Sequence, residues 1–459
     1  MVVLISAVGT VGAQPDCSTV VYEEDADGDM LVENVDQLQC INDDPVGSYR
    51  LDNDIDAEET FEWNNGTGFE PIGVTFRGTF DGDGYTVTDL YIDRPDESEV
   101  GLFASTSGDA VVENVALEQT RVTGGEAVGG LVGRNEGEVR DAHVSGTVMG
   151  EGDASTGGVV GRNVGGVVTR SSSSADVVGY RYVGGLVGRN TGEVSLSYAD
   201  GTVRGDDTVA GVVGYNLGTV RDSYSVVNAE GRVTVAGVVG RNRGSAVIRN
   251  TYAGAGRHRG TTEIRGLVAG NSATVEGSYY DVSSVDEAGD PMSDPGGIEL
   301  TTDEMTGERA RQTMTALDFE ETWETVTNPD DYPVLAWQTE ETPVLDGSDN
   351  GEDNEDGDGE DGDGNETDDE SENGESGDDG AGDGVEDGTG DGDMDDGTDD
   401  TDNETDGMDD DTGTDEGENE TDDETDGTEG DDSEGMPGFG VFVVLAAVVV
   451  VGLSRWFET

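Results

Sequence analysis

Gly-Gly-Leu-Val-Gly-Arg-Asn, at residues 184–190, is a phrase that the chain repeats with little change. It returns at 129–135 and, with valine for leucine, at 157–163. Looser copies stand at 210–216, 236–242 and 265–271. Successive copies lie 26 to 29 residues apart, and self-similarity at a fixed period in this range indicates a solenoid or a related array.

A tyrosine recurs at a nearly constant distance after the repeated phrase. Tyr198, Tyr224 and Tyr279 follow the asparagine of their copies by eight residues, and Tyr252 follows by ten. Within each unit, short valine-rich runs alternate with Gly and Asn, which favours short strands joined by tight turns. One unit cannot bury its own apolar face, so it must stack on its neighbours.

The sequence therefore predicts an all-β fold, most simply a right-handed parallel β-helix of about six 26–29-residue Gly-rich repeats with one repeat per coil. A sandwich or propeller with Gly-rich hairpins stays open as an alternative. In a β-helix the repeated asparagines would stack as an amide ladder, and the tyrosines would form a second stack. The predicted ladder consists of Asn135, Asn163, Asn190, Asn216, Asn242 and Asn271.

The two histidines do not suggest catalysis. His143 occupies the tyrosine phase and is expected to join that stack, whereas His258 lies in an irregular insertion and is expected to be exposed. The chain has only two histidines and two cysteines, and they lie far apart in the sequence, so they cannot supply a His/Cys zinc site or a His-based triad. The zinc-peptidase motif His-Glu-x-x-His is also absent. We predict no catalytic, metal-binding or cofactor-binding residue.

The composition is strongly acidic. The net charge is −83, and all 22 basic residues are arginine. Residues 346–434 hold 45 acids and no base, which leaves 60 acids and 22 arginines elsewhere, a charge of −38. Such self-repulsion opposes folding in dilute buffer, but molar salt shortens the Debye length to about 3 Å. A lysine-free acidic surface is similar to that of haloarchaeal proteins, and it excludes nucleic acid as a partner.

The N-terminal region raises four further predictions. Residues 1–13 resemble a signal peptide cleaved before Gln14, although no basic residue precedes the apolar run. Either the start is placed late or the run is a buried strand. Cys17 and Cys40 would form a disulfide in an exported protein, with two free thiols as the alternative. Residues 25–29 read as an acidic turn and not a calcium loop, and Asp81 and Asp83 as turn residues and not a catalytic pair.

Residues 14–98 are expected to form an N-terminal cap and the first coils, 99–280 the repeat array, and 281–345 a C-terminal cap. The last region would hold a short helix from about 302 to 314 and an aromatic cluster around Trp323 and Trp337. We expect that cluster to shield the open end of the solenoid. A sugar-stacking platform is the alternative.

Residues 346–435 cannot bury enough apolar surface to fold and are predicted to form a disordered stalk. Residues 436–459 contain Pro437, Gly438 and Phe439, an apolar run short for a membrane span, and a single arginine, Arg455. Candidate N-glycosylation sites are Asn65 in the folded part and Asn365, Asn403 and Asn419 in the stalk.

Two resemblances bear on function. The repeat phrase with its Ser-Tyr-Ala resembles the GLUG repeat of secreted and surface proteins, some of them bacterial immunoglobulin A peptidases. The C-terminus is similar to the PGF-CTERM sorting signal of haloarchaeal surface proteins. That resemblance implies cleavage by an archaeosortase and replacement of the tail by a lipid, although the usual basic cluster is missing. A simple hydrophobic membrane anchor is the alternative.

Together these features predict a cell-surface protein of a halophilic archaeon, with a structural or adhesive role. Its solenoid would offer a binding surface to surface-layer components or to an extracellular glycan or protein. The rival is a polysaccharide lyase or glycosidase on a β-helix scaffold. Such an enzyme needs carboxylates converging on one face, whereas Arg134, Arg162, Arg189 and Arg241 recur regularly, as in a ladder.

Overall fold

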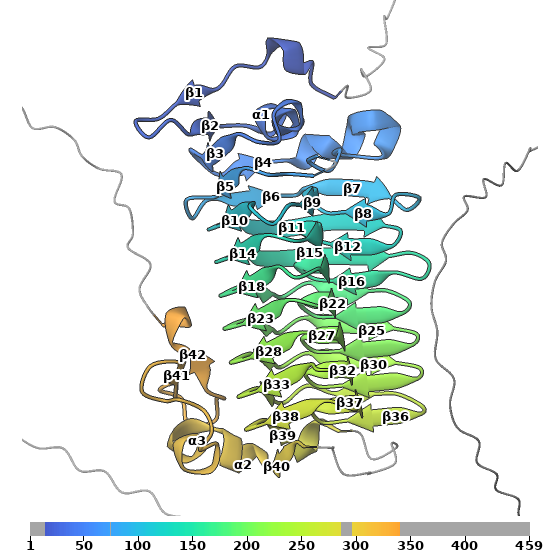
Figure 1. Ribbon diagram of the computed structural model, residues 1–459, viewed down its shortest axis with the longest axis vertical. Coiled ribbons are helices and arrows are strands. Elements are labelled where there is room, and N and C mark those ends of the chain that lie inside the picture. The colour runs from blue at the N-terminus through green and yellow to red at the C-terminus, as the bar shows by residue number, and fades with distance from the viewer. Residues whose placement is uncertain (1–13, 74, 286–295, 340–459) are drawn as a thin grey trace, which may run out of the picture. The chain divides into compact units, whose positions relative to one another are not determined.

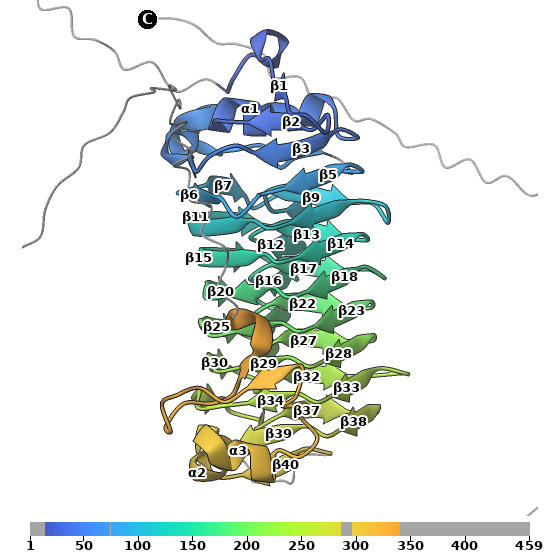
Figure 2. The same ribbon diagram turned by 90° about the vertical axis from the view of Figure 1, so that its left-hand side faces the viewer.

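The computed structural model describes residues 14–73, 75–285 and 296–339, which form a parallel β-solenoid (Figures 1 and 2). Each strand pairs with the equivalent strand of the next coil. Val132 is in register with Val160, and Val160 with Val187, so the coil length equals the sequence period. The predicted all-β solenoid is confirmed. A sandwich or propeller is excluded because the pairing between coils is parallel.

Four sheets run along the column, and we name them A to D. Sheet A has eleven strands, of which β1 alone is antiparallel to its neighbour. Its strands are β1 (Glu23–Glu24), β2 (Met30–Val32), β3 (Ser48–Leu51), β5 (Thr79–Asp81), β10 (Val111–Glu113), β14 (Glu138–Arg140), β18 (Val167–Thr169), β23 (Glu193–Ser195), β28 (Thr219–Arg221), β33 (Val247–Arg249) and β38 (Thr274–Glu276).

Sheet B has fifteen strands because most coils cross it with two short ones. They are β4 (Ile55–Asp56), β6 (Thr86–Thr88), β7 (Tyr91–Arg94), β11 (Ala116–Gly124), β15 (His143–Gly150), β19 (Ser172–Ser173), β20 (Asp176–Val178), β24 (Tyr198–Ala199), β25 (Thr202–Gly205), β29 (Tyr224–Ser225), β30 (Asn228–Gly231), β34 (Tyr252–Ala253), β35 (His258–Arg259), β39 (Tyr279–Asp281) and β40 (Ile298–Leu300).

Sheets C and D have seven strands each. Sheet C consists of β9 (Phe103–Thr106), β13 (Val132–Asn135), β17 (Val160–Asn163), β22 (Val187–Asn190), β27 (Val213–Asn216), β32 (Val239–Asn242) and β37 (Val268–Asn271). Sheet D consists of β8 (Glu99–Val100), β12 (Ala127–Gly129), β16 (Ser155–Gly157), β21 (Tyr182–Gly184), β26 (Thr208–Ala210), β31 (Thr234–Ala236) and β36 (Glu263–Arg265).

One coil passes through sheets D, C, A and B in turn, as β21 to β25 do. Each coil adds a few fully buried aliphatic side chains to one continuous core, such as Val183, Leu186 and Val194. Burying a side chain of this size stabilises the fold by roughly 1.5–3 kcal/mol. Because the burial depends on the coils above and below, the stability comes from stacking and not from any single repeat.

The glycines of the repeat phrase allow the layers to approach closely. Sheet D lies between sheets B and C, and strands such as β12 and β16 are buried along their whole length. A Cβ on Gly188 of sheet C would lie 2.5 Å from the backbone nitrogen of Thr156 in sheet D. A Cβ on Gly185 would lie 2.2 Å from the carbonyl oxygen of Gly211 in the next coil. Alanine at either position would force the backbone layers apart.

The corner between sheets A and B has a left-handed backbone in coil after coil. Most of the residues there are Asn or Asp, which tolerate this conformation, but Arg170 (φ 47°) and Leu196 (φ 50°) adopt it as well. The other corner residues are Asn114, Asp141, Asp222, Asn250 and Gly277.

Short helices flank the array. They are α1 (Val35–Cys40), α2 (Thr302–Met305) and α3 (Gly307–Thr313), with 3₁₀ turns η1 (Cys17–Thr19), η2 (Ile41–Asp43), η3 (Glu58–Gly66), η4 (Val282–Ser284) and η5 (Ala336–Gln338). The helix predicted from about 302 to 314 is broken in two, because Thr306 is extended and Gly307 is left-handed. The coils also continue before the repeat array, since β2, β3 and β5 join sheet A ahead of β10.

The C-terminal segment follows a course that the sequence did not predict. After β40 and the two helices it turns back along the flank of the lower coils (orange in Figures 1 and 2), where β41 (Trp323–Glu324) pairs with β42 (Val334–Leu335). The indole nitrogen of Trp337 donates a hydrogen bond to the carbonyl of Leu196 at 2.9 Å, three coils before the last. The aromatic cluster therefore covers the side of the solenoid. Its placement at the open end was wrong.

Candidate functional site

The six predicted asparagines form one continuous column at the turn between sheets C and A. Each Nδ2 donates to the Oδ1 of the next coil, at 2.9 Å from Asn135 to Asn163 and at 2.8 Å from Asn163 to Asn190. The bonds onward through Asn216 and Asn242 to Asn271 measure 2.9, 2.9 and 3.1 Å. Asn135 to Asn242 are completely buried.

The amides also close the turns that follow them. The Oδ1 of Asn190 accepts from the backbone N–H of Gly192 at 3.0 Å, and its Nδ2 also reaches the carbonyl oxygens of Gly192 and Thr219 at 3.2 Å. Buried polar groups are stable only when they are hydrogen-bonded. The ladder is therefore a structural device with every group occupied, and it offers no polar atom to a ligand.

The structure contains a second buried ladder, made of serine hydroxyls, that we did not predict from the sequence. Ser197 accepts a hydrogen bond from the backbone N–H of Ser171 at 3.1 Å and donates to the carbonyl of Ser195 at 2.7 Å. Ser223 repeats both contacts one coil later. The sequence pattern that could have predicted it is a serine or threonine directly before the position that tyrosine occupies in most repeats. These residues are Ser171, Ser197, Ser223, Thr251 and Ser278.

The tyrosines stack in parallel, but they do not face solvent. The ring centroids of Tyr198 and Tyr224 are 5.0 Å apart and those of Tyr224 and Tyr252 are 4.9 Å apart, and in both pairs the ring planes are nearly parallel. Trp323 packs 5.4 Å from Tyr252, whose hydroxyl donates to the carbonyl of Pro333. Desolvation raises the pKa of Tyr252 well above its usual value. The rings of Tyr224 and Tyr252 are therefore covered, whereas the sugar-stacking platform considered for the aromatic cluster around Trp323 and Trp337 stays a prediction.

The histidines have structural surroundings. His143 lies in the tyrosine column, where the next coil carries Ser172, so its Nδ1 contacts a hydroxyl at 2.8 Å instead of a ring. Burial lowers the pKa of His143. His258, predicted to be exposed, is 1% exposed, because the insertion forms strand β35 of sheet B. Burial lowers its pKa to about 4.

The other predicted residues are scattered. Cys17 and Cys40 form a disulfide that joins η1 to α1. Asn65 is exposed in η3, with a left-handed backbone. Asp25 closes its turn by accepting three backbone N–H groups, and Asp81 accepts from the backbone of Asp83.

Several predictions fall outside the described residues. They are the signal peptide at 1–13, the stalk at 346–435, the sequons Asn365, Asn403 and Asn419, and the sorting motif Pro437, Gly438 and Phe439.

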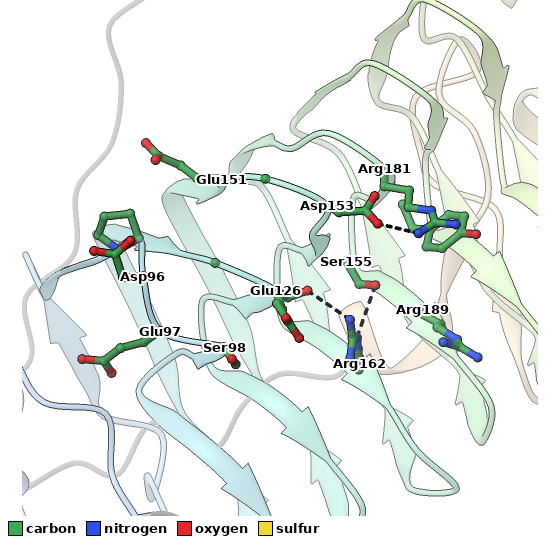
Figure 3. Close-up of a pocket in the computed structure, with 14 residues that line it drawn as sticks. Asp96, Glu97, Ser98, Glu126, Glu151, Asp153, Ser155, Arg162, Arg181 and Arg189 are labelled. Atoms are coloured by element: carbon green, nitrogen blue, oxygen red, sulfur yellow. Dashed lines mark hydrogen bonds and ion pairs between the residues drawn. The ribbon is translucent and has the colours of Figure 1, made fainter. Parts of the chain in front are cut away.

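A surface hollow of about 540 Å³ lies beside sheets C and D (Figure 3). Turns between sheets B and D of successive coils supply carboxylates to one side of it. Sheet C supplies arginines to the other. We call this the arginine hollow; its charged lining residues are Asp96, Glu97, Glu126, Glu151, Asp153, Arg162, Arg181 and Arg189.

The three arginines of the hollow differ in their contacts. Arg181 donates to Asp153 at 2.6 Å and lies 4.9 Å above the ring of Tyr182. Arg162 reaches only the hydroxyl of Ser155 and the carbonyl of Glu126, both at 3.5 Å, the outer limit of hydrogen bonding. The Nε of Arg189 is buried without a hydrogen-bond partner. Among the described residues, neither Arg162 nor Arg189 has a carboxylate within ion-pair distance.

The described residues contain no group of three or more His, Cys, Asp or Glu side chains placed to hold a metal ion. They also contain no helix that is both long and apolar enough to cross a membrane.

Comparison with known proteins confirms the repeat and the fold. Residues 124–149 and 179–204 match the GLUG motif. Halomucin of Haloquadratum walsbyi is 37% identical over 346 residues, which make up 70% of this chain and 3% of Halomucin. A candidate Gly-rich membrane protein of Evansella cellulosilytica is 36% identical over 150 residues, 31% of this chain and 17% of that protein. The chain thus spans a small part of either relative.

A solved structure has the same fold. The crystal structure of a candidate immunoglobulin A1 protease from Bacteroides ovatus aligns with a TM-score of 0.50 at 17% identity, covering 70% of this chain and 97% of that one. At this identity the likeness concerns the fold alone and carries no activity with it.

Proposed function

We propose that this protein is a surface scaffold of a halophilic archaeon, whose solenoid head presents binding surfaces outside the cell. The observation that carries the proposal is the regularity of the head. Its buried polar columns are fully hydrogen-bonded from coil to coil, so they hold a long rigid column and do not converge on a reaction centre. The similarity to Halomucin and the lysine-free acidic composition support a surface location in brine.

The acidic segment at 346–435 would act as a stalk, and the C-terminus would attach it to the membrane. Pro437, Gly438 and Phe439 support cleavage by an archaeosortase-type enzyme and a lipid anchor. The apolar run behind them would serve as the anchor if it is retained.

A role as a polysaccharide-degrading enzyme has less support. His143, the more accessible of the two histidines, has serine hydroxyls at both ring nitrogens, at 2.8 and 3.4 Å. Among the described residues, no carboxylate is hydrogen-bonded to its ring, so it lacks the acidic partner of a catalytic triad. The arginine hollow holds carboxylates, but they face unpaired guanidinium groups and therefore suit binding.

Immunolabelling of intact cells in molar salt tests the location. Antibodies against the head should label intact cells, and added protease should remove the label, while a cytoplasmic protein stays protected. Labelling only after lysis would refute the proposal. Mass analysis of the C-terminus tests the anchor separately, since recovery of Trp456 to Thr459 in the mature membrane-bound protein would rule out cleavage.

A further inference from the structure

Arg162 and Arg189 occupy the same position on adjacent strands of sheet C. Neighbouring strands lie about 4.8 Å apart, so two positive side chains stand side by side with no carboxylate partner among the described residues. Like charges placed directly opposite each other destabilise a sheet. An unneutralised pair is more notable in a protein whose acids far outnumber its bases.

The neighbouring turns explain why this pair is unpaired. Arg134, one coil earlier in the column, contacts Glu99 at 4.0 Å and also pairs with Glu136. The position of Glu99 in sheet D is taken by Ala127 and then Ser155 in the following coils. Arg162 and Arg189 thereby face small side chains, and room for a ligand opens in front of them.

The rest of the hollow indicates which anion fits. Across from the arginines stand the carboxylates of Asp96, Glu97 and Glu151 (Figure 3). They can accept hydrogen bonds from hydroxyl groups, but they would repel a ligand that is anionic along its whole length. The ligand therefore needs one negative group for the arginines and several hydroxyls for the acids.

Aromatic rings complete the basic side. Tyr182 lines the hollow, and its ring lies 4.8 Å from that of Tyr215, over which the guanidinium of Arg189 sits at 5.7 Å. The guanidinium of Arg181 lies over the ring of Tyr182 in the same way, so the two rings help to hold these cations in place. The volume of about 540 Å³ falls within the roughly 300–1,000 Å³ of small-molecule sites.

We propose that the arginine hollow binds an acidic saccharide, with a uronate carboxylate held between Arg162 and Arg189 and sugar hydroxyls bonded to the opposing acids. A planar carboxylate matches the fork of an arginine. Such short-range contacts persist in molar salt, where long-range attraction is screened. The inference deepens the proposed surface function by naming a ligand class for the head.

The test is calorimetric titration of the full chain, in molar KCl, with a trisaccharide that carries a single galacturonate residue and with the matched neutral galactose trisaccharide. We expect binding of the uronate and not of the neutral sugar. Arg162→Gln with Arg189→Gln should weaken uronate binding roughly tenfold or more, as expected for lost hydrogen bonds to a charged group. Arg241→Gln is the matched control: it lies in the same column but is paired with Asp207 at 3.0 Å, and it should leave binding unchanged.

Circular dichroism must show that all variants are folded. Equal binding of both trisaccharides, or equal loss in the double variant and in Arg241→Gln, would overturn the proposal. A synthetic peptide of residues 351–370 provides the competing acidic ligand. If it binds through Arg162 and Arg189 and the uronate does not, the hollow takes an acidic segment of this chain instead. Uronate binding by a protein found only inside cells would overturn the surface function and leave the site intact.

Discussion

Replacement of Asn190 by alanine should break the amide ladder at its centre. The Oδ1 of Asn190 accepts from Asn163 at 2.8 Å and from Gly192 at 3.0 Å, and its Nδ2 donates to Asn216 at 2.9 Å. The substitution removes all three bonds inside a fully buried column. Asn163 keeps its bond to the carbonyl of Gly166 at 2.9 Å, so the neighbouring amides are only partly orphaned.

Most of the lost stability should come from the backbone N–H of Gly192 and from the side-chain amide atoms of Asn163 and Asn216, which lose their partner on Asn190. Leaving a buried donor or acceptor unsatisfied costs about 1–3 kcal/mol, and we expect the free energy of unfolding to fall by that amount. Val164→Ala is the matched control, because Val164 follows the ladder asparagine of the preceding coil and is 36% exposed. Thr191→Ala should fall between the two, since the Thr191 hydroxyl accepts from Gly165 at 3.1 Å on the exposed side of the turn.

Urea unfolding in molar KCl, followed by circular dichroism and tryptophan fluorescence together, measures these differences. A lower midpoint at unchanged slope reports lost stability, whereas a changed slope reports a change in the unfolded or folded state. Equal midpoints for Asn190→Ala and Val164→Ala would show that the ladder contributes nothing, and the assignment of the column as a structural device would be refuted.

The remaining predictions concern salt, covalent linkage, backbone strain and pH. Lowering KCl from molar to millimolar should unfold the head, because screening of its acidic charge is lost; an identical thermal melt at both concentrations would refute this. Serine at both Cys17 and Cys40 should cost up to about 3 kcal/mol in the same urea assay, and an unchanged midpoint would contradict it. Leu196→Gly should be more stable than Leu196→Ala by roughly 1–2 kcal/mol, because both lose the packing of Leu196 on the tyrosine column and only glycine relieves the left-handed backbone at φ 50°; equal urea midpoints for the two variants would count against that strain. Burial lowers the pKa of His258 to about 4 in the folded protein, against about 6.5 in the unfolded chain. Its contribution to the free energy of unfolding is therefore complete above about pH 6.5 and is lost as the pH falls to about 4, a loss on the order of 3 kcal/mol. The free energy of unfolding of His258→Asn should depend less on pH between these values.

The period of the sequence specified the coil because one phrase marks the same place in every turn. The spacing of the asparagines is the register of sheet C, in which Asn163 pairs with Asn190 and Asn190 with Asn216. Close approach of the backbone layers favours glycine at the positions of Gly185 and Gly188, and the second of these is alanine only in the last copy, at Ala269. Each of these packing requirements involves neighbouring coils alone and recurs in every coil, so it leaves a periodic pattern that can be recognised in one sequence.

The course of the C-terminal segment could not be read in the same way. Its contacts join residues more than a hundred positions apart, such as Tyr224 and Gln338 or Leu196 and Trp337. No period relates such pairs. Aromatic residues after the last repeat indicated that they would cover something, but not that the tyrosine column was the surface to be covered.

The arginine hollow could be predicted only in part. The sequence shows that arginine recurs at one position of the repeat, but it does not show which of these arginines form ion pairs. Arg134, Arg162, Arg189 and Arg241 share one position in the repeat, and a ladder reading treats them as equivalent. In the structure the first and last are neutralised by Glu136 and Asp207, while the middle two are not. What separates them lies in the turns between sheets B and D and at the first position of the sheet D strands, which is Glu99, Ala127, Ser155 and Tyr182 in successive coils. In a solenoid the repeated residues build the column, and specific chemistry arises where one coil lacks the partner that its neighbours have.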